Sequence, residues 1–262
     1  MAKLLTGKLP ERIDRTGDVA AAKAAWAAFR SENGRKSYWP LLTQPLDNQK
    51  LAKSGTPTYG LSLAPHSLSG YNVCPKSTPT CRAGCVAFSG NGGFRQVAAG
   101  RVMRVKFLAE HPEHFVTLLD AEITRAEAKH GKIAVRLNTF SDLPWHTLTP
   151  WLFAEHPVVQ FYDYTKVWDR SMYVPDNWHL TYSASERTTD ADVIGSVLAD
   201  RNVAMVFKAS RANELPATWH GIPVIDGDKS DDRAADPRGV IVGLRAKGLM
   251  RRDIGKSKMI HA

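Results

Sequence analysis

The sequence contains very little cysteine: there are three among its 262 residues, and all three lie within residues 74–85. An odd number of cysteines cannot pair completely, and a cytoplasmic chain is not expected to keep structural disulfides. The basic start, residues 1–15, lacks both the apolar stretch and the small-residue cleavage site of a secretory leader. These features argue against a disulfide-stapled secreted protein, and we expect a cytoplasmic one.

Long apolar runs and low-complexity tracts are also missing. No window approaches the roughly 18 to 20 apolar residues of a membrane span, so no membrane partner is expected. Hydrophobic residues make up 43% of the chain and seven residues are tryptophan, a composition typical of folded rather than disordered proteins. The length suits one large domain, or a domain with a short extension.

Acidic residues are fewer than basic ones: the chain has 26 Asp and Glu against 35 Lys and Arg, which gives a net charge of +9. The basic residues are spread along the chain, with short clusters only at residues 101–106 and 247–252. A basic surface of this kind can attract the phosphates of nucleic acid. Nucleic acid contact is therefore an open alternative for this chain.

Helical and strand-like patterns follow one another along the chain. Residues 18–33 are predicted to form a helix that Asp18 caps and Gly34 ends. A proline-punctuated cover segment follows, and helical spacing returns at residues 94–109 and 112–130. Short apolar runs typical of buried strands lie at residues 58–65, 132–138, 158–164, 179–185, 203–209, 222–228 and 239–245.

The alternation of strands with helix-length spacers predicts an α/β fold with parallel strands, because a parallel pair needs a crossover connection. We expect a (β/α) barrel of the TIM type, partial or irregular, with an N-terminal helical extension. An open doubly wound sheet is the alternative. The predicted domains are residues 1–56, a helix and cover segment, and residues 57–262, the barrel with the cysteine loop.

The cysteine loop has the spacing C-x6-C-x3-C, formed by Cys74, Cys81 and Cys85. Three thiolates can hold an iron–sulfur cluster, [4Fe-4S] or [3Fe-4S], and leave one corner open or absent. Zinc in a structural site usually has four protein ligands, and His66 could complete such a set. Three cysteines packed in an ordinary loop are the third interpretation, but the polar residues around them would make a poor core.

Polar side chains also follow the predicted strands. The carboxyl ends of parallel strands are where β/α proteins collect their binding groups, so we expect a polar cavity beside the cysteine loop. A small-molecule or nucleotide-like ligand is the expected occupant. The candidate ligand-binding residues are Arg136, Asn138, Asp142, Asp163, Lys166, Lys208 and Asp226.

The chain resembles a family of bacteriophage proteins, known mostly as a numbered gene product of mycobacteriophages and described as radical-SAM-like. The resemblance is carried by LSLAP, CPKSTPTCRAGC, VRLNTFSDLPW, FYDYTK, YSASE, VFKAS and VIDGDKSDDRAADPRGVIVGLRAKG, in this order over roughly residues 58–250. It implies a partial (β/α) barrel in the cytoplasm of the host cell. It also implies that Cys74, Cys81 and Cys85 bind a [4Fe-4S] cluster whose fourth iron binds S-adenosylmethionine.

The cysteine spacing departs from the usual radical-SAM pattern, C-x3-C-x2-C, in both gaps. A Gly-Gly-Glu element for the methionine end of S-adenosylmethionine is not evident after residues 132–138. The expected function is therefore iron–sulfur cluster binding with redox or radical-SAM-like chemistry on an unknown substrate. The alternatives are a nucleic-acid-binding or nicking protein with a structural zinc or iron–sulfur site, and a catalytically silent cluster-binding module.

Overall fold

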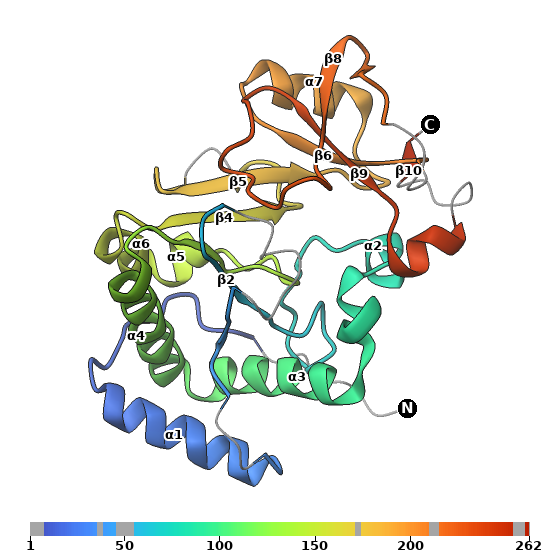
Figure 1. Ribbon diagram of the computed structural model, residues 1–262. Helices are drawn as coiled ribbons and strands as arrows, with labels where there is room; N and C mark the ends of the chain where they lie inside the picture. The colour runs from blue at the N-terminus through green and yellow to red at the C-terminus, as the bar shows by residue number, and fades with distance from the viewer. Residues whose placement is uncertain are drawn as a thin grey trace. The chain divides into compact units, whose positions relative to one another are not determined.

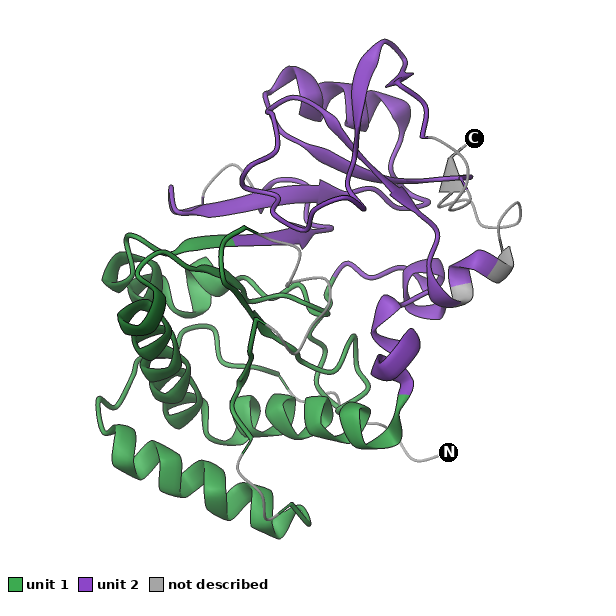
Figure 2. Cartoon of the chain, viewed as in Figure 1, with its two compact units in different colours: residues 1–75, 94–161 green, residues 76–93, 162–262 purple. Residues whose placement is uncertain are grey.

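The computed structural model describes residues 8–35, 39–45, 55–170, 174–209, 215–253 and 260–261. The chain forms two compact units, and each consists of two stretches of sequence. Unit 1 contains residues 1–75 and 94–161, and unit 2 contains residues 76–93 and 162–262 (Figure 2). The predicted boundary between residues 56 and 57 is not tested by this division and stays a prediction.

The helices of unit 1 follow the helical spacing of the sequence. α1 (Val19–Glu32), α3 (Arg95–Glu110) and α4 (Pro112–His130) confirm the three predicted helices, and they contact one another (Figure 1). The Asp18 carboxylate caps α1 by accepting the Ala21 N–H at 2.9 Å. Two short helices, α5 (Trp145–Leu148) and α6 (Pro150–Glu155), were not predicted. Across the part of the chain that the structure describes, no helix combines the length and apolar character needed to cross a membrane.

Two charged side chains, one half-buried and one buried, fix residues 39–42 onto the helices of unit 1. Glu122 of α4 accepts the backbone N–H groups of Leu41 and Leu42 at 3.0 and 2.8 Å. Arg104 of α3 donates to the Pro40 carbonyl at 2.8 Å and lies over the Trp39 ring. Burial raises the pKa of Glu122 and lowers that of Arg104 to about 10. Leu41 and Leu42 are fully buried as a result.

The sheet is mixed and mostly parallel. β2 (Thr58–Leu61), β3 (Ala134–Arg136), β4 (Gln160–Thr165), β5 (Trp178–Ser183), β6 (Val203–Phe207), β8 (Ile222–Asp226) and β9 (Ile241–Arg245) match the seven predicted strands. The sequence did not predict β1 (Leu42–Thr43), β7 (Thr218–Trp219) or β10 (Ile260–His261). The strand order is β1-β2-β3-β4-β5-β6-β9-β8-β7, and β10 pairs with β6.

The strand order shows an α/β sheet that is open by its hydrogen bonds. Among the described residues, β1 and β7 are the end strands, and each pairs antiparallel with its one neighbour. β9 lies between β6 and β8, so the strands do not follow sequence order at this end. The predicted α/β class and parallel pairing are confirmed, whereas closure into a TIM-type barrel is not shown.

The core of unit 2 lies between its strands and α7 (Asp190–Leu198). Thr189 and Asp192 form a capping box at the start of this helix, since each side chain accepts the other's backbone N–H. Val193 of α7 packs with buried side chains of β6 and β9, among them Val203 and Phe207. The helix therefore covers this part of the sheet, as a parallel crossover requires.

Two helical glycines provide opposite predictions for stability. Gly195 of α7 is exposed, and an added Cβ would meet only open space, so Gly195→Ala should raise the free energy of unfolding by about 0.5–1 kcal/mol. Gly100 of α3 lies against the Trp39 ring, which a Cβ would overlap. Gly100→Ala should therefore lower the free energy of unfolding by about 1–3 kcal/mol, the usual cost of overpacking. Urea unfolding of both variants checks this, and equal effects of the same sign would contradict it.

Candidate cysteine site and strand ends

Cys74 is held by the loop that follows β2 in unit 1. The thiol is half-buried and its Sγ accepts the backbone N–H of His66 at 3.2 Å. His66 has a φ of +42°, which is a left-handed conformation that non-glycine residues rarely adopt. The Cys74 N–H donates to Asn72 Oδ1 at 3.0 Å, and the Cys74 thiol lies 3.5 Å from the Phe140 carbonyl oxygen. The sulfur is therefore fixed by backbone groups from two loops of unit 1.

Cys81 lies in a five-residue helix of unit 2, α2 (Pro79–Ala83). Thr78 caps this helix, because its Oγ1 accepts the Cys81 N–H at 3.1 Å. The same hydroxyl donates to the Glu186 carboxylate at 2.8 Å, and the Thr80 N–H reaches that carboxylate at 3.4 Å. Burial alone would raise the pKa of Glu186, but these hydrogen bonds outweigh it and lower the pKa below its ordinary value.

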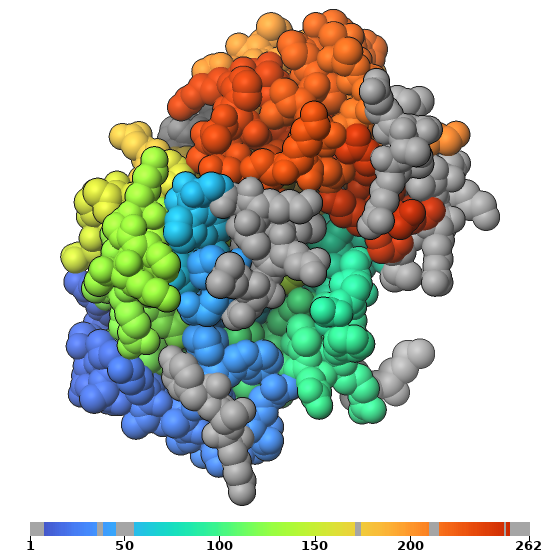
Figure 3. Space-filling model, in the orientation of Figure 1, coloured from blue at the N-terminus to red at the C-terminus, as the bar shows by residue number. Residues whose placement is uncertain are grey.

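Cys85 is separated from α2 by Gly84 alone and directly precedes a short 3-10 turn, Val86–Phe88. Val86 and Phe88 are exposed, whereas Ala87 between them is buried. Atoms of the turquoise part of the chain, to which this segment belongs, lie at the surface in Figure 3. Gly84 packs against Met250, a buried residue of the same unit. Cys81 and Cys85 are both half-buried.

The three cysteines are thiols that form no disulfide among the described residues. Within the same part of the chain, no group of three or more Cys, His, Asp or Glu side chains is placed to hold a metal ion. Cys74 belongs to unit 1, whereas Cys81 and Cys85 belong to unit 2. The donor chemistry suits an iron–sulfur cluster, since the ligands are thiols and the Cys74 sulfur accepts a backbone N–H of the kind that surrounds cluster sulfurs. The cluster itself stays a prediction.

The candidates after β3 lie in unit 1. Asn138 is 3% exposed, and its Oδ1 accepts from the Ser141 hydroxyl at 2.8 Å, the Leu143 N–H at 2.9 Å and the Trp145 indole at 3.2 Å. Its amide therefore holds the loop after β3. Asp142 is buried, and its backbone N–H donates to the Val73 carbonyl at 2.8 Å, next to Cys74. Arg136 is half-buried at the end of β3.

The candidates of β4 lie in unit 2. Asp163 is fully buried and accepts the Trp178 indole N–H at 3.2 Å. Lys166 donates to the Ser183 carbonyl, the Ser183 hydroxyl and the Ala184 carbonyl at 3.1, 3.1 and 3.2 Å. An ammonium group has three N–H donors, so these contacts can engage all of them. Lys166 therefore anchors the end of β5.

Asp226, the candidate of β8, forms a two-point ion pair with Arg245 of β9 at 2.9 and 3.1 Å. Asp228 accepts the Arg245 backbone N–H at 3.0 Å and pairs with Lys247. The pKa of Asp226 is lowered, mainly by its hydrogen bonds from Arg245. These paired charges hold the ends of two neighbouring strands together, while Lys208, the candidate that follows β6, is exposed. Ligand binding by the seven candidates stays a prediction.

The family model described as Gene product 88 matches residues 39–261 of the chain. The chain belongs to the gene product 88 family. The predicted membership of a numbered phage gene-product family is thereby confirmed at the level of the family, while the radical-SAM-like chemistry stays a prediction. Searches of the curated proteins and of the solved structures found no match.

The basic cluster at residues 101–106 of this gene product 88 family chain lies largely in the interior. Arg101 and Arg104 are 7% and 4% exposed, and their guanidinium groups lie over the rings of Phe140 and Trp39 at 4.3 and 4.7 Å. Both rings belong to unit 1. Buried cations stacked on aromatic rings are not presented to phosphates. The cluster therefore gives no support to nucleic acid contact.

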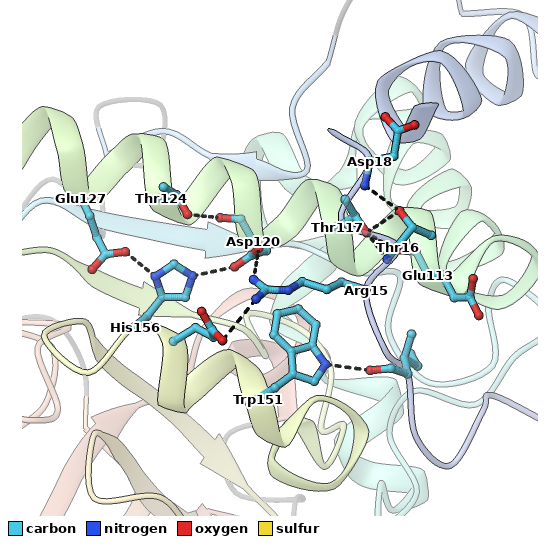
Figure 4. A network of polar contacts seen from close by, with 12 residues as sticks. Arg15, Thr16, Asp18, Glu113, Thr117, Asp120, Thr124, Glu127, Trp151 and His156 are labelled. Carbon is cyan, nitrogen blue, oxygen red and sulfur yellow. Dashed lines mark hydrogen bonds and ion pairs between the residues drawn. The ribbon is translucent and has the colours of Figure 1, made fainter. Parts of the chain in front are cut away.

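The sequence did not predict a polar network that lies in unit 1 of this family member. His156 lies between two carboxylates of α4, with its Nε2 2.9 Å from Asp120 Oδ1 and its Nδ1 bonded to Glu127 (Figure 4). Arg15 contacts Asp120 at 2.7 Å and Glu155 at 3.2 Å. Asp120 and Glu127 are seven residues apart on one helix, so they share a face. That spacing was the available signal for a paired site.

The hydrogen bond between Thr78 and Glu186 was also not predicted from the sequence. Thr78 is followed by Pro79, and Thr before Pro is a recognised sequence signal for the start of a helix. The partner carboxylate lies 108 residues further along the chain. The start of α2 could therefore have been predicted from the sequence, but its attachment to Glu186 could not.

Proposed function

We propose that this gene product 88 family chain is an iron–sulfur protein in which Cys74, Cys81 and Cys85 hold a [4Fe-4S] or [3Fe-4S] cluster. The observation that supports it most is the state of the cysteines. Among the described residues all three are half-buried thiols outside any disulfide, and each takes part in a hydrogen bond that involves the backbone.

A bound cluster would supply one-electron chemistry, and three protein thiolates would leave one iron open to a small ligand such as S-adenosylmethionine. The chain's own residues would bind and orient the substrate. Lys208 is exposed after β6 and suits an anionic group, while Arg136 is half-buried after β3. Asn138 in unit 1 and Lys166 and Asp226 in unit 2 each hold a loop or strand end of their own unit, so their contribution is to keep these segments rigid. The substrate class that fits these groups is a small anionic or nucleotide-like molecule.

Replacing Cys81 with serine is expected to abolish cluster binding. Anaerobically reconstituted wild-type protein should be brown, with roughly three or four irons and matching sulfide per chain. The Cys81→Ser variant should lose at least two thirds of the iron and the visible colour, because two thiolates hold a cubane poorly. Iron and sulfide assays with visible absorption measure this.

The matched control is Ser77→Ala, a hydroxyl change in the same segment that should leave the iron content unchanged. Wild-type protein that stays colourless after reconstitution, or that takes up a single zinc ion instead, would overturn the proposal. Electron paramagnetic resonance with S-adenosylmethionine adds a second result. A shifted cluster signal supports the radical-SAM-like chemistry, and an unchanged signal limits the proposal to a cluster without this cofactor.

A further inference from the structure

We infer that Glu186 is a positioning residue for the Cys81–Cys85 half of the cysteine site. This role rests on the proposed cluster for its function, but its geometry lies entirely within unit 2. The carboxylate holds the turn that precedes Cys81, and through this turn it determines where the sulfur of Cys81 lies. Glu186 lies in the turn that follows β5, three residues after the end of the strand.

A continuous chain of hydrogen bonds joins Cys81 to the carboxylate. The Cys81 N–H donates to Thr78 Oγ1 at 3.1 Å, and the Thr78 hydroxyl donates in turn to Glu186 Oε2 at 2.8 Å. A hydroxyl can donate and accept at once, so one side chain serves both bonds. The Thr80 N–H adds a longer contact of 3.4 Å to Glu186 Oε1. Because the final acceptor is ionised, these bonds are stronger than bonds between neutral groups.

The segment after β5 is itself fixed by contacts within the unit. Lys166 donates to the Ser183 and Ala184 carbonyls, and the Ser185 N–H donates to Thr188 Oγ1 at 2.9 Å. Glu186 therefore extends from a well-anchored loop. Because its own loop is anchored, the Glu186 carboxylate can fix the position of the turn that precedes Cys81.

The α2 helix needs such an anchor because it has only five residues. Isolated helices of this length are not stable in water, because the free-energy cost of nucleating a helix exceeds the stabilisation that a single turn provides. The far end of α2 is held by Gly84, whose backbone packs against the buried Met250 side chain. Glu186 at the start and Met250 at the end together define the position of the two cysteines. Of these two anchors, Glu186 is the one that carries a charge.

The first test uses metal-free protein, so that it does not depend on a cluster. Glu186→Gln keeps the shape of the side chain and removes the charge, while Glu186→Ala removes both. We expect amide hydrogen exchange at Thr80 and Cys81, and alkylation of Cys81 by iodoacetamide, to become about tenfold faster in Glu186→Ala, as for the loss of a hydrogen bond to a charged group. Glu186→Gln should fall between this variant and the wild type. Alkylation of Cys74 should stay within about twofold of the wild-type rate.

The matched control is Asp176→Ala, which removes an exposed carboxylate of the same unit and should change neither rate at residues 78–85. A double-mutant cycle with Thr78→Val then tests the proposed relay. If Glu186 acts through Thr78, the double variant Thr78→Val with Glu186→Gln should exchange no faster than the faster single variant. Full additivity of the two effects would contradict the relay.

The second test uses reconstituted protein. Glu186→Ala should retain less than half of the wild-type iron. Glu186→Gln should keep most of it, but with an altered visible circular dichroism spectrum and a more positive reduction potential, because a negative charge near the cluster is lost. A purely structural role would change the iron content without changing the spectrum of the retained cluster.

The two proposals fail in different ways. If wild-type protein binds no cluster but Glu186→Ala still loosens residues 78–85, the cluster proposal fails and the positioning by Glu186 stands. If wild-type protein binds a cluster and both Glu186 variants match it in exchange, alkylation, iron content and spectrum, the role of Glu186 is overturned.

Discussion

Replacing His156 with alanine is expected to lower the free energy of unfolding by about 3 kcal/mol, the low end for breaking a buried ion pair. The imidazole is 4% exposed and lies between the carboxylates of Asp120 and Glu127, which are themselves mostly buried. The variant would leave these two negative charges with Arg15 as the remaining contact of Asp120. Urea unfolding at pH 5.5 measures the loss.

The loss should shrink as the pH rises. Burial alone would lower the pKa of His156, but its hydrogen bonds to Asp120 and Glu127 outweigh burial and raise the pKa above the ordinary 6.5. A raised histidine pKa stabilises the fold fully below the unfolded value, about 6.5, and this contribution is lost as the pH rises through the folded value. For Asp120 burial is likewise outweighed, by hydrogen bonds from His156 and Arg15, and its lowered pKa makes its contribution complete above about pH 4 and lost as the pH falls through the folded value.

The two directions together predict that the network stabilises unit 1 most between about pH 4 and 6.5. His130→Ala, an exposed histidine at the end of α4, is the matched control and should change stability by less than about 0.5 kcal/mol. A loss for His156→Ala that is the same at pH 5.5 and pH 8.5 would show that the histidine acts by packing rather than by its charge.

Replacing Asn138 with alanine is expected to lower the free energy of unfolding by a similar amount, about 3 kcal/mol. The change removes the acceptor shared by the Ser141 hydroxyl, the Leu143 N–H and the Trp145 indole, and each buried donor left without a partner costs about 1–3 kcal/mol. Trp145 is fully buried, so water cannot easily replace the lost acceptor. Thermal and urea unfolding measure the effect.

This second prediction separates two roles for the same residue. The matched control is Asn91→Ala, the same chemical change at an exposed position, which should alter stability by less than about 0.5 kcal/mol. If Asn138 served mainly to bind a ligand, Asn138→Ala would be nearly as stable as wild type and would lose ligand affinity instead. Stability close to that of Asn91→Ala would therefore contradict the structural role.

Local patterns in the sequence predicted the elements of the fold but not how the strands are ordered. The helix after Asp18 and the strands of β6 and β9 were predictable because their periodicity and caps are encoded within a few residues. The placement of β9 between β6 and β8 depends on which crossovers form, and no local pattern specifies that. β1 and β7 have two residues each, too few for a periodicity to be recognised.

The same distinction between local patterns and long-range contacts applies to the candidate site. The cysteine loop and the polar strand ends are visible in the sequence, because polar residues directly after apolar runs are unusual in a core. Their partners are not visible: Asp226 pairs with Arg245, 19 residues away, and Asp163 accepts from Trp178, 15 residues away. A polar side chain at a strand end can therefore be predicted from sequence, but whether it binds a ligand or a neighbour depends on contacts that only the fold creates.

The bond between Thr78 and Glu186 also sets an order of events during synthesis. The two residues are 108 positions apart, and at about 5–20 residues per second the ribosome needs roughly 5 to 20 seconds to pass from one to the other. From residue 85 onward, which is nearly all of this interval, the nascent chain contains Cys74, Cys81 and Cys85, while the carboxylate that anchors α2 does not yet exist. The thiols are therefore made first and held in place later, so any cluster delivered to the nascent chain would meet a loop that is not yet anchored.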